Sequence, residues 1–162
     1  MKLQCGAVIT DIPNIPLLQS HKERWEHWIS ALTSGEYLQN RDALRTGNKF
    51  CCMGVACDLL NPYGWIRDGD QFVFSLHGDN AKLDSSGQCL SPAVRRLYGG
   101  MGPLGFHVSG RFPDGKGETV ELKHFAITGL NDMGATFDEL ADILTKAMSG
   151  GYTYRLELIQ LH

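Results

Sequence analysis

Cys52, in the apolar segment Phe50–Leu60, is the residue whose type and position come closest to those of a catalytic nucleophile. The segment predicts a short helix, and the positive end of a helix dipole lowers the pKa of a thiol near the first turn. A neighbouring imidazole would complete the activation of such a thiolate. Cys52 also shares a predicted helix face with Val55 and Leu59, and free cysteines in such settings are commonly small buried side chains. We therefore favour a core role for Cys52 and keep catalysis as the alternative.

The residues from Cys52 to Val55, C-M-G-V, resemble the C-S-G-[LFV] start of the nucleophile helix in papain-like peptidoglycan peptidases. The histidine of those enzymes opens a later strand, so the resemblance implies that His124, which begins the run H-F-A-I, is the partner of Cys52. The pattern departs from the family at Met53, and Cys51 stands where an aspartate frequently precedes the nucleophile. A cysteine hydrolase using Cys52 and His124 is the alternative function that this resemblance implies.

A second set of residues is suited to a phosphate-bearing ligand. Guanidinium groups bind phosphate in a bidentate manner, and glycines let a ligand approach the backbone. The basic members of the set flank the glycine-rich run 99–105 and are Arg95, Arg96 and Arg111. Asn131 and Asp132 precede a predicted helix, whose free amides can hold an anion. For both groups we favour a structural alternative, a solvated helix face with its loop and a polar turn before the helix.

Asp58 lies late in the same apolar segment as Cys52. A carboxylate buried there needs a partner. Arg45 or Arg67 could pair with it, or it could face a ligand.

We predict no metal site and no cofactor. Adjacent cysteines, and cysteines six residues apart on a helix, point in different directions and make poor joint ligands. The glycine-rich run matches neither the P-loop pattern nor the dinucleotide-binding pattern.

Two amphipathic helices with capping signals are the clearest structural elements. Ser20 and Glu23 have the S-x-x-E form of a capping box and predict a helix over residues 21–34. Its apolar stripe consists of Trp25, Trp28, Ile29 and Leu32. Thr136 and Glu139 repeat the pattern at the start of a helix that Gly150–Gly151 should end. Alternating residues over 152–158 then predict a final strand, whose free edge could pair with a second copy of the chain.

Shorter elements fill the space between these helices. They are a buried helix over Phe50–Leu60, a strand within residues 65–76, a loop over 78–87, a helix over Pro92–Tyr98, and a hairpin of residues 106–112 and 118–123. In the first of them Gly54 permits the close approach of another element. We predict one compact α+β domain over residues 1–162, with three to four helices packed on a small, mainly antiparallel sheet.

Composition and charge exclude several classes of protein. With 15 basic and 18 acidic residues and no long run of either sign, the chain lacks the basic surface of a general nucleic-acid binder. No segment reaches the roughly 20 apolar residues needed to cross a bilayer, and residues 1–18 lack the apolar region of a signal peptide. We therefore expect a cytoplasmic protein with no membrane partner, whose five cysteines remain thiols.

Three segments together resemble small phage and prophage proteins. They are Trp28–Tyr37 (W-I-S-A-L-T-S-G-E-Y), Phe50–Leu59 (F-C-C-M-G-V-A-C-D-L) and Leu130–Asp142 (L-N-D-M-G-A-T-F-D-E-L-A-D). The resemblance implies a phage setting and life in the cytoplasm of a bacterial host, and it brings no catalytic residue with it. It does not extend to the middle of the chain, residues 65–125.

Three function classes follow from these observations. We place first a binding protein that inhibits or sequesters a host component, such as a defence protein or its nucleotide signal. The cysteine hydrolase is the alternative from the enzyme class, and a phage accessory protein acting through interactions, with homo-oligomers as one form, is the third. Binding is favoured over catalysis because catalysis needs a convergent set of residues.

Overall fold

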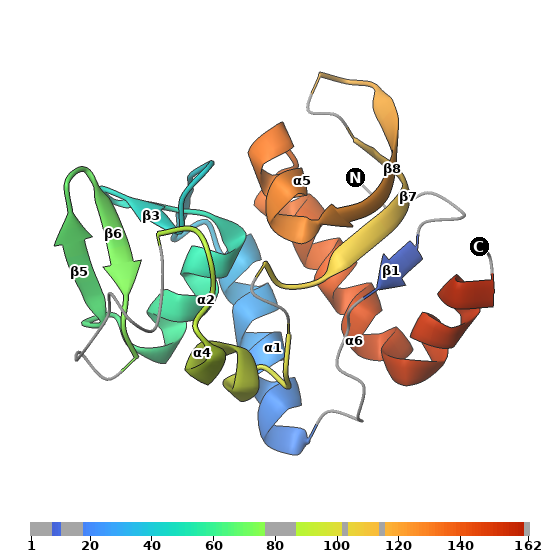
Figure 1. Ribbon diagram of the computed structural model, residues 1–162, viewed down its shortest axis with the longest axis horizontal. Coiled ribbons are helices and arrows are strands. Elements are labelled where there is room, and N and C mark those ends of the chain that lie inside the picture. The colour runs from blue at the N-terminus through green and yellow to red at the C-terminus, as the bar shows by residue number, and fades with distance from the viewer. Residues whose placement is uncertain (1–7, 11–17, 77–86, 102–103, 114–115, 161–162) are drawn as a thin grey trace.

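Two sheets and the helices packed between and beside them form an α+β fold (Figure 1). The computed structural model describes residues 8–10, 18–76, 87–101, 104–113 and 116–160. The α+β prediction is confirmed, with two separate sheets in place of the single one expected.

One half of the molecule carries a five-stranded sheet in the order β2-β4-β3-β6-β5. Its strands are β2 (Leu38–Gln39), β3 (Arg45–Thr46), β4 (Lys49–Phe50), β5 (Trp65–Asp68) and β6 (Gln71–Phe74). The helices of this half are α2 (Cys52–Leu60) and α4 (Pro92–Leu97). Strands β5 and β6 form an antiparallel hairpin where the sequence analysis expected one strand, because Gly69 takes a left-handed conformation (φ 68°) that turns the chain back.

The other half carries a three-stranded antiparallel sheet in the order β1-β7-β8. Its elements are β1 (Val8–Thr10), β7 (His107–Pro113), β8 (Thr119–Ala126), α5 (Ile127–Met133) and α6 (Phe137–Gln160). The predicted hairpin is confirmed as β7 and β8. Helix α5 was not predicted.

Helix α1 (Gln19–Thr33) joins the two halves, because it contacts α2 on one side and α6 on the other. Its predicted stripe is confirmed: Trp25, Trp28 and Leu32 are buried. Both indoles are also hydrogen-bonded, Trp25 Nε1 donating to the Tyr98 carbonyl (2.8 Å) and Trp28 Nε1 to the Cys52 carbonyl (2.9 Å). The tryptophans thus fix α1 through both apolar burial and backbone contacts.

The capping predictions have mixed outcomes. Helix α1 begins at Gln19, and the Leu18 N–H donates to His21 Nδ1 (3.2 Å), so the predicted box of Ser20 and Glu23 is wrong. The second box is confirmed, since the Glu139 N–H donates to Thr136 Oγ1 (3.2 Å). The cap of α4 is confirmed as well, with the Val94 N–H donating to Ser91 Oγ (3.4 Å).

The final strand predicted over residues 152–158 is wrong, because α6 continues through Gly150–Gly151 to Gln160. Each glycine costs a helix about 1 kcal/mol relative to alanine, which weakens it without necessarily stopping it. The segment after the glycines contains Arg, Leu, Glu and Gln, which are good helix formers. The edge that this strand would have offered to a second copy is therefore not formed.

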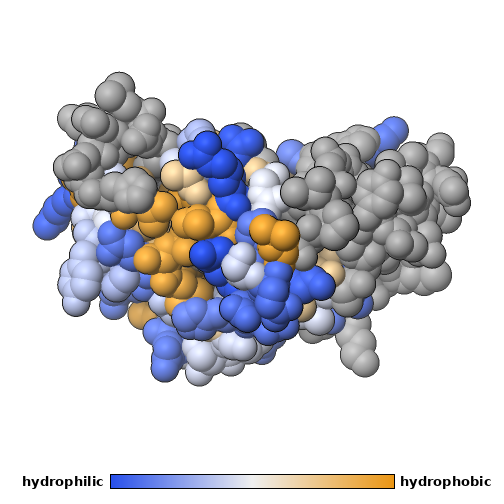
Figure 2. Space-filling view, turned by 90° about the horizontal axis from the view of Figure 1, so that it is seen from below, coloured by the Kyte–Doolittle hydropathy of each residue, from blue (hydrophilic) through white to orange (hydrophobic). Residues whose placement is uncertain are grey.

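Apolar side chains gather on one face of the molecule, over the half that carries the five-stranded sheet, α2 and α4 (Figure 2). Large exposed apolar areas on proteins often mark interaction sites. Among the residues that the structure describes, every helix is too short or too polar to cross a lipid bilayer.

Candidate functional site

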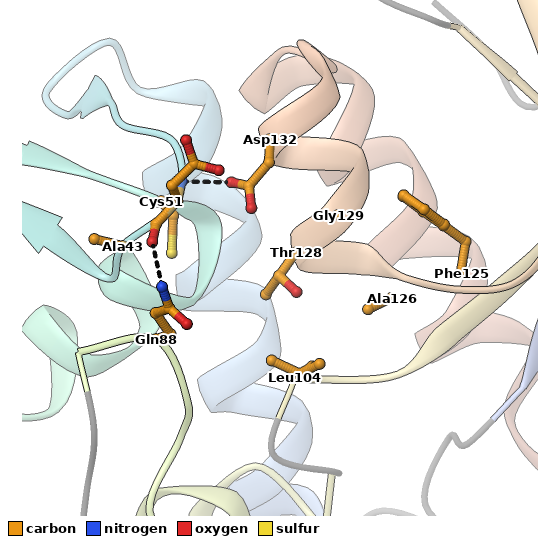
Figure 3. Close-up of a pocket in the computed structure, with 10 residues that line it drawn as sticks. Ala43, Cys51, Gln88, Leu104, Phe125, Ala126, Thr128, Gly129 and Asp132 are labelled. Atoms are coloured by element: carbon orange, nitrogen blue, oxygen red, sulfur yellow. Dashed lines mark hydrogen bonds between the residues drawn. The ribbon is translucent and has the colours of Figure 1, made fainter.

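A pocket of about 370 Å³ opens between the two halves of the fold (Figure 3). One wall comes from the five-stranded half and consists of Asp42, Ala43, Cys51 and Gln88. The other wall comes from the three-stranded half and consists of Leu104, Phe125, Ala126, Thr128, Gly129 and Asp132. The pocket is thus built from segments that lie far apart in the sequence.

The loop of residues 40–44 reaches the pocket because Gly54 has no side chain. A Cβ atom at this position would collide with the carbonyl oxygen of Leu44, so the prediction that Gly54 permits close approach is confirmed. The loop is fixed there by two backbone hydrogen bonds, from the Cys51 N–H to the Leu44 carbonyl (3.0 Å) and from the Leu44 N–H to the Gly87 carbonyl (2.8 Å). A sequence feature of α2 therefore sets the position of one pocket wall.

Asp42 occupies the tip of this loop in a left-handed conformation (φ 67°), the only such non-glycine residue among those described. Short polar residues tolerate this conformation better than others. Its N–H donates to Asp132 Oδ1 (2.9 Å), and its carbonyl accepts a hydrogen bond from Gln88 Nε2 (3.2 Å). The loop is thereby tied both to α5 and to the chain that precedes α4.

Asn131 is the buried centre of the polar contacts behind the pocket, with no exposed surface. Its Oδ1 accepts hydrogen bonds from Gln39 Nε2 (2.9 Å) and from the Cys52 N–H (3.2 Å). Its Nδ2 donates to the Asn40 carbonyl (2.7 Å). The Asn131 side chain therefore connects α5 with α2 and with the loop of residues 40–44. It positions the pocket walls from behind and does not line the pocket itself.

The thiol of Cys51 lies at the pocket as the N-cap of α2, and only 5% of the residue is exposed. Burial raises its pKa to about 12, against the lowering effect of the Gly54 N–H, which donates to Sγ (3.4 Å). The negative charge of Asp132 also raises it. Near neutral pH Cys51 is therefore an uncharged lining group.

Cys52 is fully buried, as the sequence analysis favoured. Burial raises the pKa of its thiol well above the ordinary value, and the nearby Cys51 and Asp132 raise it further. A nucleophilic cysteine requires the opposite environment, accessible and electropositive. The side chain of His124, on β8, lies outside the described atoms, so the contact that the hydrolase hypothesis requires stays a prediction.

The three arginines predicted to bind phosphate do not line the pocket. Arg95, on α4, donates from Nε to the Met101 carbonyl (2.7 Å), and Arg96 is exposed on the same helix. Arg111 is exposed on β7, where it lies opposite Glu121 on β8. Of the five predicted ligand-binding residues, Asp132 is the one that lines the pocket.

Sequence analysis missed Asp42, Gln88 and Thr128 as lining residues and the helix that carries Thr128. A signal for α5 does exist, because Ile127 and Leu130 have helical spacing and Gly134 follows as a left-handed C-cap (φ 114°). No comparable signal marks Asp42 or Gln88, since both reach the pocket only through tertiary contacts.

The described residues contain no group of three or more His, Cys, Asp and Glu side chains arranged to hold a metal ion.

Comparison with known proteins relates part of the chain to a protein family. Residues 20–95 match the model of a domain of unknown function, DUF8296. No curated protein and no solved structure gives a significant match. The matched segment includes one wall of the pocket and ends before the other begins.

Proposed function

We propose that this chain is a binding protein that inhibits or sequesters a component of a bacterial host, with the pocket of Figure 3 as its ligand site. The observation that carries the proposal is the preformed geometry of the pocket. The Asp42 loop is fixed by Asp132 and Gln88 before any ligand arrives. Such preorganisation reduces the entropy that binding must overcome, and pockets of this size are typical ligand sites.

Binding is favoured over hydrolysis because the described lining of the pocket contains no activated nucleophile. Cys51, the one thiol among the described lining residues, is protonated near neutral pH, and Cys52 lies behind the wall with no exposed surface. No described imidazole is hydrogen-bonded to either thiol.

The phage setting of the proposal rests on the three motifs given above. In the fold these motifs meet at Cys52, whose carbonyl accepts the hydrogen bond of Trp28 and whose N–H donates to Asn131. Residues of all three motifs therefore frame the back of the pocket. A set of proteins sharing these motifs would share the frame, which supports a common ligand-binding role.

A second candidate function is that of an accessory protein acting through protein interactions. The apolar area of Figure 2 favours it, since such areas commonly serve as interfaces. A ligand-binding protein requires an open pocket, whereas an accessory protein that binds through the apolar area does not.

Filling the pocket tests the proposal directly. Thr128 is half-buried on the pocket wall, and Thr128→Tyr places a phenol ring in the cavity. The matched control is Thr119→Tyr, at an exposed position on β8. Each protein is incubated with the low-molecular-mass and the protein fractions of a bacterial lysate. Bound masses are then recorded by native mass spectrometry, and melting temperatures are measured.

We expect the wild type and Thr119→Tyr to retain the same bound component and Thr128→Tyr to lose it. A ligand at about one hundred times its Kd stabilises by about 2.7 kcal/mol, which corresponds to a melting shift of about 5–10 °C for a domain of this size. A component that binds Thr128→Tyr as tightly as the wild type would overturn the pocket assignment and favour the interaction surface. If neither fraction yields a component that binds the wild type, the binding proposal fails.

A further inference from the structure

The lining of the pocket carries negative charge that the described residues do not neutralise. Asp132 uses Oδ1 to accept hydrogen bonds from the Asp42 N–H and from Asn131 Nδ2, whereas its Oδ2 has no described partner. The Asp42 carboxylate has no described partner either. Among the described residues, no lysine, arginine or histidine lines the pocket, and none lies within 4.0 Å of either carboxylate.

On the wall formed by the Asp42 loop and the start of α2, the hydrogen-bond donors are, in contrast, already engaged within the protein, whereas the donors of Thr128 and Gly129 at the start of α5 have no described partner. The Asp42 N–H donates to Asp132, and Gln88 Nε2 donates to the Asp42 carbonyl. At the start of α2, the Cys52 N–H donates to Asn131 and the Gly54 N–H to the Cys51 sulfur. An anionic ligand would find free donors at the start of α5 but would also meet the two carboxylates of Asp42 and Asp132, whose charge repels it.

The opposite wall supplies apolar surface. Leu104, Phe125 and Ala126 are each half-buried at the pocket, so part of every side chain remains accessible to a ligand. Figure 3 places these three residues across the cavity from Ala43 and Gln88. A ligand that fills the cavity thus meets charge at one end and hydrocarbon along its length, which suits the alkyl stems of lysine and arginine.

We propose that the pocket binds a cationic hydrogen-bond donor on a short apolar stem, a guanidinium or a primary ammonium, with Asp132 and Asp42 as its carboxylate partners. The proposal rests on the proposed function, because it names the ligand class of the same pocket. The open Oδ2 of Asp132 can accept one charge-assisted hydrogen bond from a guanidinium or an ammonium, and the Asp42 carboxylate, with no described partner, can accept two parallel ones from a guanidinium. The group is supplied either by a small amine or guanidine metabolite of the host or by a lysine or arginine side chain of a host protein.

Two probes and one anion test the ligand class. Agmatine presents a guanidinium on a free alkyl chain, N-acetyl-arginine methylamide presents it as in a polypeptide, and adenosine monophosphate is the anionic comparison. Each is titrated into isotope-labelled protein, and amide shifts are followed by NMR. We expect both guanidinium probes, but not the nucleotide, to shift the amides of Thr128, Gly129 and Asp132 in a saturable manner.

Asp132→Asn is the decisive variant, since it removes the charge and keeps an oxygen for the Asp42 N–H. We expect it to weaken guanidinium binding about tenfold or more, an effect typical of losing one member of a charge pair. Asp68→Asn, on the exposed strand β5, is the matched control and should bind like the wild type. Unchanged affinity in Asp132→Asn, or tighter binding of the nucleotide than of agmatine, overturns the proposal.

The outcomes separate the ligand class from the proposed function and identify the source of the cation. If Thr128→Tyr abolishes binding of a host component but no guanidinium probe binds the wild type, the ligand class is wrong and the binding function stands. If neither a host component nor any probe binds, both fail. Tighter binding of N-acetyl-arginine methylamide than of agmatine, which carries a second positive charge, indicates a protein side chain, whereas binding of agmatine alone indicates a free metabolite.

Discussion

The two ends of α2 each lie beside an aspartate, and the two carboxylates are used differently. Asp58, near the C-terminal end, accepts from Trp65 Nε1 through Oδ1 (2.9 Å) and from the Tyr37 hydroxyl through Oδ2 (2.7 Å). Asp132, across the pocket from the N-terminal end, uses only Oδ1 in the described contacts. Both oxygens of Asp58 therefore accept hydrogen bonds within the protein, whereas Asp132 Oδ2 has no described partner.

A partly buried carboxylate can bind a ligand through an oxygen that the protein leaves without a donor, and Asp58 has no such oxygen. Sequence analysis suggested that Asp58 would pair with Arg45 or Arg67 or face a ligand, and the structure corrects this. The guanidinium of Arg45 lies over the Phe72 ring at 4.2 Å, and Arg67 Nε donates to the Gly69 carbonyl (3.1 Å). Both carboxylate oxygens of Asp58 accept hydrogen bonds from Tyr37 and Trp65, so Asp58 has a structural role.

The largest expected loss of stability comes from removing the Trp28 side chain, which packs on α2 and donates to the Cys52 carbonyl. Trp28→Ala deletes a fully buried indole and its hydrogen bond to the Cys52 carbonyl, and we expect the free energy of unfolding to fall by about 3–5 kcal/mol. Urea denaturation followed by circular dichroism measures it. Trp28→Phe, which keeps a ring but loses the donor, should cost less. A loss below about 1 kcal/mol for Trp28→Ala would contradict the packing of α1 on α2.

Replacing each of the two aspartates by asparagine should change the stability by different amounts. In Asp58→Asn one acceptor becomes an NH₂ group that faces a donor, so we expect the free energy of unfolding to fall by about 1–3 kcal/mol. Asp132→Asn keeps the single oxygen it uses and should cost less than about 1 kcal/mol. Equal losses in urea denaturation would show that the two carboxylates are equally engaged and that the pocket is closed.

The pKa of Tyr37 gives a second measurement of the contacts of Asp58. Burial and the hydrogen bond and charge of Asp58 raise this pKa above its ordinary value. In Asp58→Asn the charge is gone while the burial remains. The phenol pKa should therefore fall toward its ordinary value, as measured by ultraviolet absorbance titration on the alkaline side. An unchanged pKa would show that Asp58 does not act on Tyr37.

The smallest expected effect is the lack of reaction at the buried thiols. Cys51, Cys52 and Cys57 are buried, whereas Cys89 is half-exposed and serves as the internal reference. Near neutral pH we expect iodoacetamide to alkylate Cys89 in the folded protein and these three buried thiols only after unfolding, as peptide mass spectrometry can show. Fast labelling of Cys52 that is lost in His124→Ala would instead favour the hydrolase.

The raised thiol pKa values also give a pH dependence with a definite sign. The Cys51 thiol ionises at about 12 in the folded protein against an ordinary value of 9.0. Above pH 9 the unfolded chain therefore loses protons that the folded chain keeps, and the free energy of unfolding falls as the pH rises toward 12. Urea denaturation at increasing pH measures this fall, and Cys51→Ala should reduce it. A stability that is unchanged up to pH 12 would contradict the burial of the thiols.

The sequence by itself determined the elements whose signals are local. The tryptophan stripe of α1, the capping box of Thr136 and Glu139, the cap of α4 and the β7–β8 hairpin all depend on residues within a few positions of one another. The need for Gly54 could also be seen, although not which element would approach it. Local signals failed at Gly150–Gly151, where helix formation continues despite the glycines.

The residues of the candidate site come together only through tertiary contacts. Asp42, Gln88 and Asp132 are brought together by hydrogen bonds that span 46 and 90 positions of the chain. Such long-range contacts leave no periodicity in the sequence, because each residue needs to be compatible only with its own loop or helix. The raised thiol pKa of Cys52 likewise depends on its burial by other elements, which a four-residue motif does not reveal.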